Sequence, residues 1–294
     1  MDAAAAFQLA ATVVVNLALA VIVGASVFVM WLRDVDQRDM PIAAPSAVIP
    51  WATLVALLGS IASMWLEAAR MAEVPINAAW PAVQAMALST HYGQVWWIGI
   101  VALLIALTSC FVADHYKDIL RFIALTAFAF SRSASGHAAD AGDISLAVAI
   151  ESIHLLLVSL WLGEVIVASV LLRGVTEPRA MYFVDKLSAS ATWALTGIFA
   201  TGVLNSWRMV APVEGTLDSI YVAILGIKIA LVFAAAVLGG INRFFVMPAM
   251  RSSSSGFSPA MHRFRQILVI EAVVLTSALY MAALLASTQP PHSG

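Results

Sequence analysis

The feature that most constrains this chain is a series of apolar runs, each long enough to cross a bilayer as a helix. The first run, at residues 4–31, contains no charged side chain. A spanning helix needs about 20 apolar residues, whereas a strand of a membrane barrel needs only about 10 in an alternating pattern. The runs in this chain are long and do not alternate. They therefore predict an all-α fold, a polytopic transmembrane helical bundle.

Composition agrees with this fold class and excludes several functions. Of the 294 residues, 62% are hydrophobic and 11% are charged, and the mean hydropathy is +0.94. Soluble domains carry about 25% charged residues. The net charge of −2 gives no basis for nucleic-acid binding, and the single cysteine, Cys110, cannot form an intramolecular disulfide. The first ten residues have an acid where a signal peptide has Lys or Arg, so we expect the first span to be retained.

Proline, glycine and charged residues divide the apolar runs into eight predicted spans within a single membrane domain, residues 1–294. The spans are expected near residues 4–31, 47–70, 92–114, 117–134, 143–172, 184–209, 219–247 and 263–287. The fourth span is the weakest because it is short and has Arg132 near its end. Between the second and third spans, Pro75 and Pro81 disfavour a continuous helix over residues 71–91.

The distribution of Lys and Arg supports the fourth span and predicts the orientation. With eight spans, the connections after the first, third, fifth and seventh spans share one side and hold eleven Lys and Arg residues, while the other side holds three. Cytoplasmic connections carry the excess of Lys and Arg. The basic side is therefore predicted to be cytoplasmic and both termini periplasmic. Without the fourth span, every later connection would change sides.

The strongest candidate site begins in the stretch "GHAADAGDISLAVAIESIHLLLVSLWLGE", residues 136–164, where an acidic loop passes into an apolar helix. Glu151 and His154 lie one helical turn apart and share a face. If the helix begins near Asp143, His154 lies about 16 Å along it, near the middle of a hydrocarbon core of about 30 Å. Ionisable groups at this depth normally face the bundle interior and mark a functional site.

Other metal-ligating residue types collect on the same, outward side. Gly136 and Gly142 give the loop the freedom to bring a loop histidine towards the helical one. Imidazole suits copper, zinc, iron and nickel, methionine sulfur favours Cu(I), and a carboxylate can bind the metal or orient an imidazole. Each residue also has a structural interpretation, methionine as apolar filler and histidine as a group bonded to a carbonyl. The predicted metal ligands are His137, His154, Glu151, His91, Asp140, Met64, Glu67 and Met71.

A second set of interior polar residues is predicted to be structural. Asn16 and Asn205 are typical of the single polar residues that hold membrane helices together. Lys228 in the seventh span and Glu271 in the eighth fall at similar depths, so their simplest interpretation is a buried ion pair. The pair would fix the packing of the last two spans.

Six stretches follow one another across most of residues 60–290: "STHYGQVWWIG", "GHAAD", "SIHLLLVSLWLGE", "LTGIFATGVLNSWRMV", "YVAILGIKIALVFAAAVLGGINRF" and "FRQILVIEAVVLTSALYMAALLASTQPP". In these stretches and their order the chain resembles the CopD family, the polytopic inner-membrane proteins of bacterial copper-resistance systems. The resemblance implies copper uptake from periplasm to cytoplasm, often discussed together with a soluble CopC-like periplasmic protein. The polar positions that resemble the family's are His91, His137, His154, Asn205, Lys228, Asn242, Arg243 and Glu271.

The leading hypothesis from sequence is therefore a copper transporter of the bacterial inner membrane that binds Cu(I) or Cu(II). Two alternatives fit the same residues. One is a membrane redox protein that holds haem b between His91 and His154, and the other is a copper sensor or scaffold that moves no metal. A nucleotide-binding loop and a recognisable nucleophile setting are both absent from the sequence, so we expect neither ATP-driven transport nor an enzyme. The expected partners are the copper ion and the lipid bilayer.

Overall fold

All regular structure in the described part of the chain is helical, which confirms the predicted all-α, polytopic bundle. The computed structural model describes residues 3–33, 45–112, 114–173, 175, 177–210, 220–252 and 254–288. The α-helices are α1 (Ala3–Arg33), α2 (Val48–Met71), α3 (Trp80–Ser89), α4 (His91–Thr108), α5 (Asp114–Ala134), α6 (Leu146–Leu171), α7 (Glu177–Val210), α8 (Ile220–Ile241), α9 (Met247–Ser252) and α10 (Ser254–Ser287). Four short 3-10 helices, η2 (Pro45–Ala47), η3 (Ile76–Ala78), η4 (Ser109–Phe111) and η5 (His137–Ala141), and the π-helical turn η7 (Asn242–Val246) lie between them.

Seven helices in the described residues are long and apolar enough to cross a membrane. They cover Ala5–Arg33, Pro45–Met71, His91–Phe111, Leu146–Leu171, Arg179–Arg208, Ile220–Ser252 and Phe257–Ser287. The predicted fourth span is also helical, as α5, and it packs against α4 and α6. It is not one of the seven, because charged residues stand in its first two turns and Arg132 stands in its last. The total of eight spans stays a prediction.

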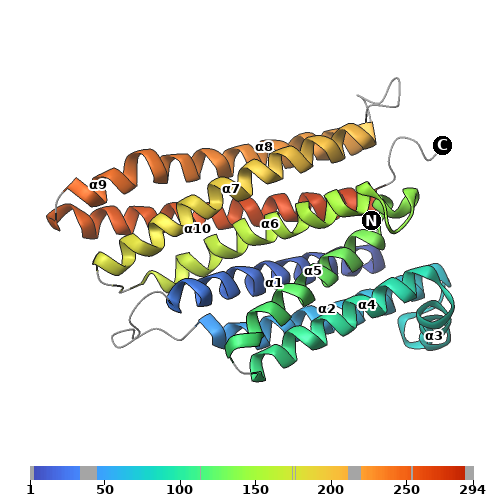
Figure 1. The fold of residues 1–294 in the computed structure, drawn as a ribbon. Helices are drawn as coiled ribbons and strands as arrows, with labels where there is room; N and C mark the ends of the chain where they lie inside the picture. The colour runs from blue at the N-terminus through green and yellow to red at the C-terminus, as the bar shows by residue number, and fades with distance from the viewer. Residues whose placement is uncertain are drawn as a thin grey trace.

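The long helices run back and forth along one bundle axis. Figure 1 shows that α1 begins and α10 ends at the same end of the bundle, and that α5 crosses it between α4 and α6. This arrangement is the one that the predicted orientation requires. That this end faces the periplasm stays a prediction. We call it the outward end.

A close helix contact joins α1 to α6 in the middle of the bundle. A Cβ atom added at Gly163 would lie 1.8 Å from the carbonyl oxygen of Ala20, and one added at Gly24 would lie 2.2 Å from the carbonyl carbon of Gly163. Small residues allow membrane helices to approach this closely. The two glycines therefore fix α1 against α6, and α2 and α10 also pack on α1.

Two helices begin earlier than the sequence predicts. α7 begins at Glu177 because its first turns bury Ala180, Phe183 and Leu187 against the core. α10 begins at Ser254 and continues through Pro259, since the turns that follow this proline also pack inside the bundle. Hydropathy alone misses these amphipathic extensions, which lie beyond the apolar spans. The region 71–91 is interrupted as predicted, and Pro81 lies in the first turn of α3.

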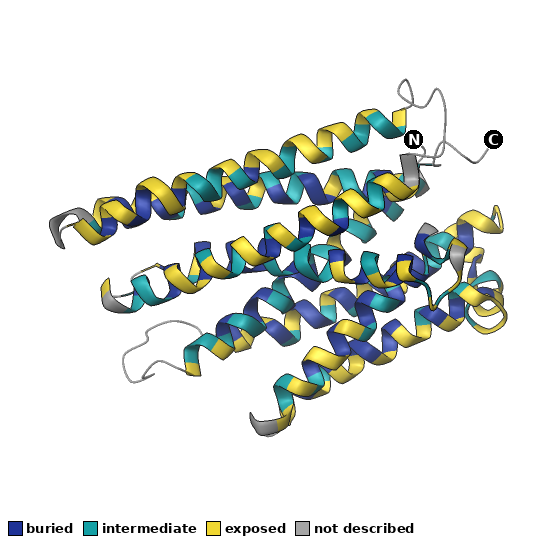
Figure 2. Ribbon diagram, turned by 45° about the horizontal axis from the view of Figure 1, so that its top comes forward, coloured by how far each residue is buried: buried dark blue, intermediate teal, exposed yellow. Residues whose placement is uncertain are grey.

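Buried and exposed residues separate by helix face. Figure 2 shows exposed residues along the outside of the peripheral helices and buried residues on the inside. On α8 the exposed side chains are large and apolar, among them Ile227 and Phe233, and Phe244 continues this surface on η7. Such a surface suits contact with lipid rather than water.

Candidate metal centre

The face of α6 that is turned into the bundle carries four polar side chains. Ser145 caps the start of this helix, and its Oγ accepts a hydrogen bond from the backbone N–H of Val148 at 3.3 Å. Glu151, His154, Trp161 and Glu164 follow at spacings of three, seven and three residues, which place them on one helix face. At 1.5 Å per residue they extend over about 20 Å of the bilayer. We call these four residues the α6 polar face.

His154 is held by α7 in an orientation that leaves one ring nitrogen free. Its side chain is buried, and Nδ1 lies 2.8 Å from Oγ1 of Thr201. The Thr201 hydroxyl also lies 2.7 Å from the carbonyl oxygen of Gly197, to which it donates its single proton. His154 must then donate from Nδ1–H to Thr201. The unprotonated nitrogen is therefore Nε2, which has no hydrogen-bond partner among the described residues and is available as a metal ligand.

Glu151 lies one helical turn from His154 towards the outward end, and α7 holds its side chain too. The side-chain amide of Asn205 on α7 donates to Oε2 of Glu151 at 2.5 Å. A Glu-x-x-His pair on one helix is a recurring way to present a carboxylate and an imidazole to one metal inside a bundle. Asn205 and Thr201, four residues apart on α7, thus fix the two potential ligands of α6.

Lys228 and Glu271 were predicted to form an ion pair, but in the structure each has a different neighbour. No ion pair joins these two side chains in the described residues. Glu271 is buried and accepts a hydrogen bond from the indole N–H of Trp161 at 2.9 Å. Lys228 instead interacts electrostatically with Glu151. Of the residues predicted to be structural, Asn205 does join two helices, whereas Oδ1 of Asn16 is buried without a hydrogen-bond partner in the described part of the chain.

The inner part of the α6 polar face holds a second carboxyl group. Glu164 is completely buried, and its Oε1 accepts a hydrogen bond from the hydroxyl of Ser190 on α7 at 2.6 Å. Its Oε2 has no partner among the described residues. Together with Trp161 and Glu271, Glu164 continues the row of polar side chains inside the bundle beyond the level of His154.

At the outward end, the other predicted ligands lie at the surface. Nε2 of His91, at the start of α4, lies 2.7 Å from Oδ2 of Asp143, and both side chains are exposed. Asp140 is exposed on η5. The backbone of His137 opens η5, but the position of its side chain lies outside the described residues. His91, Asp140 and Asp143 form an acidic, imidazole-containing surface at the outward end.

The three predicted ligands on α2 lie apart from the α6 polar face. Met64 is buried in an apolar cluster with Ala68 and Met86, Glu67 forms an ion pair with Arg70, and Met71 is 68% exposed. α2 packs on α1, α3 and α4. The structure does not bring the methionines to His154. Within the described residues, no three His, Cys, Asp or Glu side chains are grouped closely enough to hold a metal ion.

Sequence reasoning missed Thr201, Ser190 and the Trp161–Glu271 contact. Thr201 and Asn205 stand four residues apart on α7, in register with Glu151 and His154 on α6, so their spacing is a signal that could have identified the support of the site. The Trp161–Glu271 contact joins residues 110 positions apart. Local spacing carries no information about a contact between such distant segments.

Two protein-family models match the chain, one in its N-terminal half and one in its C-terminal half. Residues 1–146 match the family model described as copper resistance protein D-like, N-terminal domain, and residues 181–285 match the model described as copper resistance protein D. The inner membrane protein YebZ of Escherichia coli (strain K12) is 22% identical over 277 residues, which cover 92% of this chain and 94% of that protein. No solved structure matches the chain.

Proposed function

The chain belongs to the copper resistance protein D family and is a multi-pass protein of the inner membrane, and from this premise we propose that it binds a copper ion at Glu151 and His154 and carries it from the periplasm to the cytoplasm. The observation that carries the proposal is the free Nε2 of the buried His154 one turn from the half-buried carboxylate of Glu151. In this proposal copper is the transported substrate and not a resident cofactor.

The donor set suits copper. Imidazole nitrogen binds both oxidation states, and the carboxylate of Glu151 adds a negative charge that favours Cu(II). Thr201 holds the imidazole through the nitrogen that does not bind the metal, an arrangement that fixes the ring and its tautomer. Because Met64 and Met71 lie away from His154, methionine sulfur adds nothing to this site. His137 is the predicted residue that would complete the coordination from η5.

The surface at the outward end suits the capture of a cation. His91, Asp140 and Asp143 stand there at the ends of α4 and η5 and before α6. Exposed carboxylates raise the local concentration of a cation. Ligand exchange from this surface to Glu151 and His154 would replace water ligands stepwise. A soluble CopC-like periplasmic protein is the proposed copper donor.

Lys228 acts in this proposal as a tethered counter-cation. In the structure its charge interacts with Glu151, and it also acts on His154. A copper ion that arrives at Glu151 would take over the role of Lys228 and would in turn be repelled by it. The half-buried carboxylate of Glu151 thus keeps a positive partner both before and after copper binds, and repulsion from Lys228 favours release of the copper ion.

Copper flux into vesicles tests the proposal. Purified protein would be reconstituted into liposomes loaded with a copper-sensitive dye, and wild type would be compared with His154→Ala. Copper-dependent quenching is expected in wild type and should fall to the background of empty vesicles in the variant. His262→Ala is the matched control, because His262 is exposed on α10 and should leave the flux unchanged. Copper binding without flux in wild type would contradict transport and favour a sensor or scaffold.

A further inference from the structure

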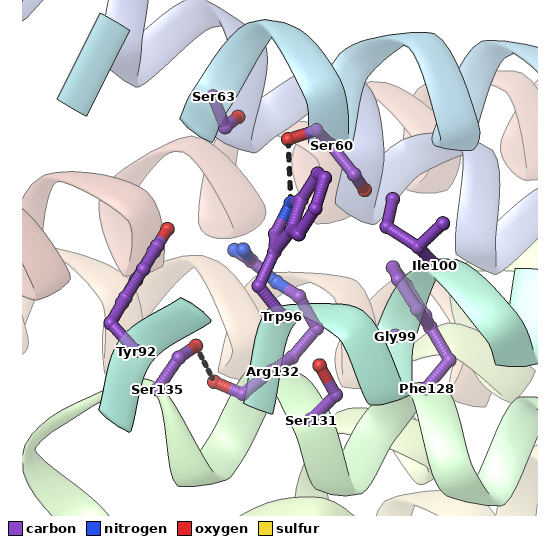
Figure 3. A pocket seen from close by; sticks show the side chains of 10 residues that line it. All are labelled: Ser60, Ser63, Tyr92, Trp96, Gly99, Ile100, Phe128, Ser131, Arg132 and Ser135. Carbon is purple, nitrogen blue, oxygen red and sulfur yellow. Dashed lines mark hydrogen bonds between the residues drawn. The ribbon is translucent and has the colours of Figure 1, made fainter. Parts of the chain in front are cut away.

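A polar cavity lies in the N-terminal half of the bundle, among α2, α4 and α5. Figure 3 shows its lining side chains, with Arg132 of α5 extending between Tyr92 and Trp96 of α4 towards Ser60 and Ser63 of α2. The cavity encloses about 20 Å³. This volume is enough for one water molecule or one ion of similar size.

The two α2 serines behave differently from other buried hydroxyl groups of the bundle. Thr53, Ser133 and Ser152 each donate to the backbone carbonyl four residues earlier, as hydroxyl groups in membrane helices commonly do. Ser60 and Ser63 are 6% and 3% exposed, and their Oγ atoms have no hydrogen-bond partner in the described residues. Two buried hydroxyl donors therefore remain unused in the lining of one cavity.

Arg132 brings a positive charge to the same cavity without a carboxylate partner among the described residues. Its Nε is buried and makes no hydrogen bond there. The nearest acid of α2, Glu67, forms its ion pair with Arg70. A charged residue at membrane depth is normally paired with an opposite charge or with backbone carbonyls, and a buried charge without compensation is strongly destabilising.

Two other polar groups of the lining are already bonded within the protein. The indole N–H of Trp96 donates to the carbonyl oxygen of Ser60 at 3.1 Å, and the hydroxyl of Ser131 donates to that of Val95 at 2.8 Å. The buried lining atoms without a partner among the described residues can all donate a hydrogen bond: the hydroxyls of Ser60 and Ser63 and Nε of Arg132. A water molecule would satisfy the hydroxyl groups but would leave the charge without a counterion.

From these observations we infer that the cavity binds one small monatomic anion of the halide class, held by Arg132, Ser60 and Ser63. Chloride supplies the missing negative charge and accepts hydrogen bonds from all three side chains. The small volume excludes sulfate, phosphate and larger organic anions. The halide site is separate from Glu151 and His154. The inference therefore does not depend on copper transport, and a finding that the protein transports no copper would not contradict it.

Thermal unfolding of the full chain in detergent tests this inference. The unfolding midpoint would be measured in sodium chloride, sodium bromide and sodium gluconate at equal ionic strength. A ligand that binds only the folded state raises the midpoint as its concentration increases. We expect chloride and bromide to raise the midpoint of wild type above its value in gluconate.

Variants show whether the halide acts in this cavity. Loss of hydrogen bonds to a charged ligand should weaken the apparent affinity for chloride by about tenfold or more in the Ser60→Ala/Ser63→Ala variant. Arg132→Gln should abolish the response. Ser133→Ala is the matched control, because Ser133 is equally buried on α5 but bonds to Ala129.

Two results would overturn the inference. Identical midpoints of wild type in chloride and gluconate would mean that the cavity holds water alone. An undiminished chloride response in Ser60→Ala/Ser63→Ala would mean that the halide binds elsewhere. If Arg132→Gln does not fold, the serine variant alone decides between these outcomes, since it removes only two hydroxyl groups.

Discussion

The bundle buries two polar regions, which lie on either side of the α1–α6 contact and differ in the sign of their charge (Figure 1). Between α6, α7, α8 and α10, carboxyl groups and an imidazole dominate, and most of them are hydrogen-bonded to a neighbouring helix. Among α2, α4 and α5, a guanidinium and unbonded hydroxyl donors dominate. The first region suits a cation and the second an anion.

The difference shows how the surroundings of a buried charge indicate its ligand. Glu151 accepts a hydrogen bond from Asn205, and the charge of Lys228 acts on its carboxylate, so both partners are present before a metal arrives. Arg132 has no such carboxylate partner among the described residues, and in our proposal a bound anion balances its charge. A carboxylate that already has partners in the protein suits a metal ion that binds and leaves. A guanidinium without a carboxylate partner suits an anion that stays bound and stabilises the fold.

The largest expected effect comes from breaking the contact that holds the two regions together. Gly163→Val would place a side chain against the carbonyl oxygen of Ala20 and force α1 away from α6. We expect a loss of about 3 kcal/mol or more of folding stability, together with the loss of both copper binding and the chloride response. Size-exclusion chromatography and thermal unfolding of the purified variant would measure this loss.

Gly226→Val is the matched control for this substitution. A Cβ atom at Gly226 on α8 meets no other atom within 4 Å, so the same chemical change should leave the bundle intact. A Gly163→Val protein that unfolds at the wild-type temperature would show that the close α1–α6 approach is not required.

A second prediction concerns the support of His154. Thr201→Val keeps the shape of the side chain but removes the acceptor for Nδ1–H, so the imidazole is no longer held with Nε2 free. Loss of such a supporting hydrogen bond typically weakens metal affinity by about 10-fold to 100-fold. Equilibrium titration with copper would measure the change. Thr196→Val is the control, because Thr196 is exposed on α7 and bonds only to the carbonyl of Thr192.

A smaller effect of opposite sign is expected at Lys228. Lys228→Met removes a cation that repels copper from Glu151 and His154, so copper should bind roughly threefold to tenfold more tightly. Release should slow, and flux into vesicles should fall although binding improves. Lys186→Met, at the other end of the bundle, should change neither quantity. Weaker copper binding in Lys228→Met would show that Lys228 supports the site rather than competing with its metal.

Hydropathy and residue spacing were sufficient for the class of fold, the places of the long helices and the pairing of Glu151 with His154 on one face. They were insufficient wherever distant segments meet. Lys228 and Glu271 lie at similar depths, and depth alone suggested a pair, but their faces on α8 and α10 direct them to different neighbours.

The α2 residues illustrate the same limit. Met64, Glu67 and Met71 share a helix face in sequence, yet α2 packs on α1, α3 and α4 and not on the α6 polar face. Spacing along one helix could not show whether these residues lie near His154, because helix order in space is set by packing. The cavity around Arg132 depends on contacts among three helices and has no signature in local sequence.

Copper content, copper affinity and the optical spectrum of detergent-purified protein test the central claim most directly, with wild type, His154→Ala and Ser60→Ala/Ser63→Ala measured side by side. We predict about one copper per wild-type chain, no Soret band, an affinity lowered by about 100-fold or more in His154→Ala, and unchanged copper binding in the serine variant. Wild-type copper affinity in His154→Ala, or a haem spectrum that disappears with His154, would contradict the proposed copper site.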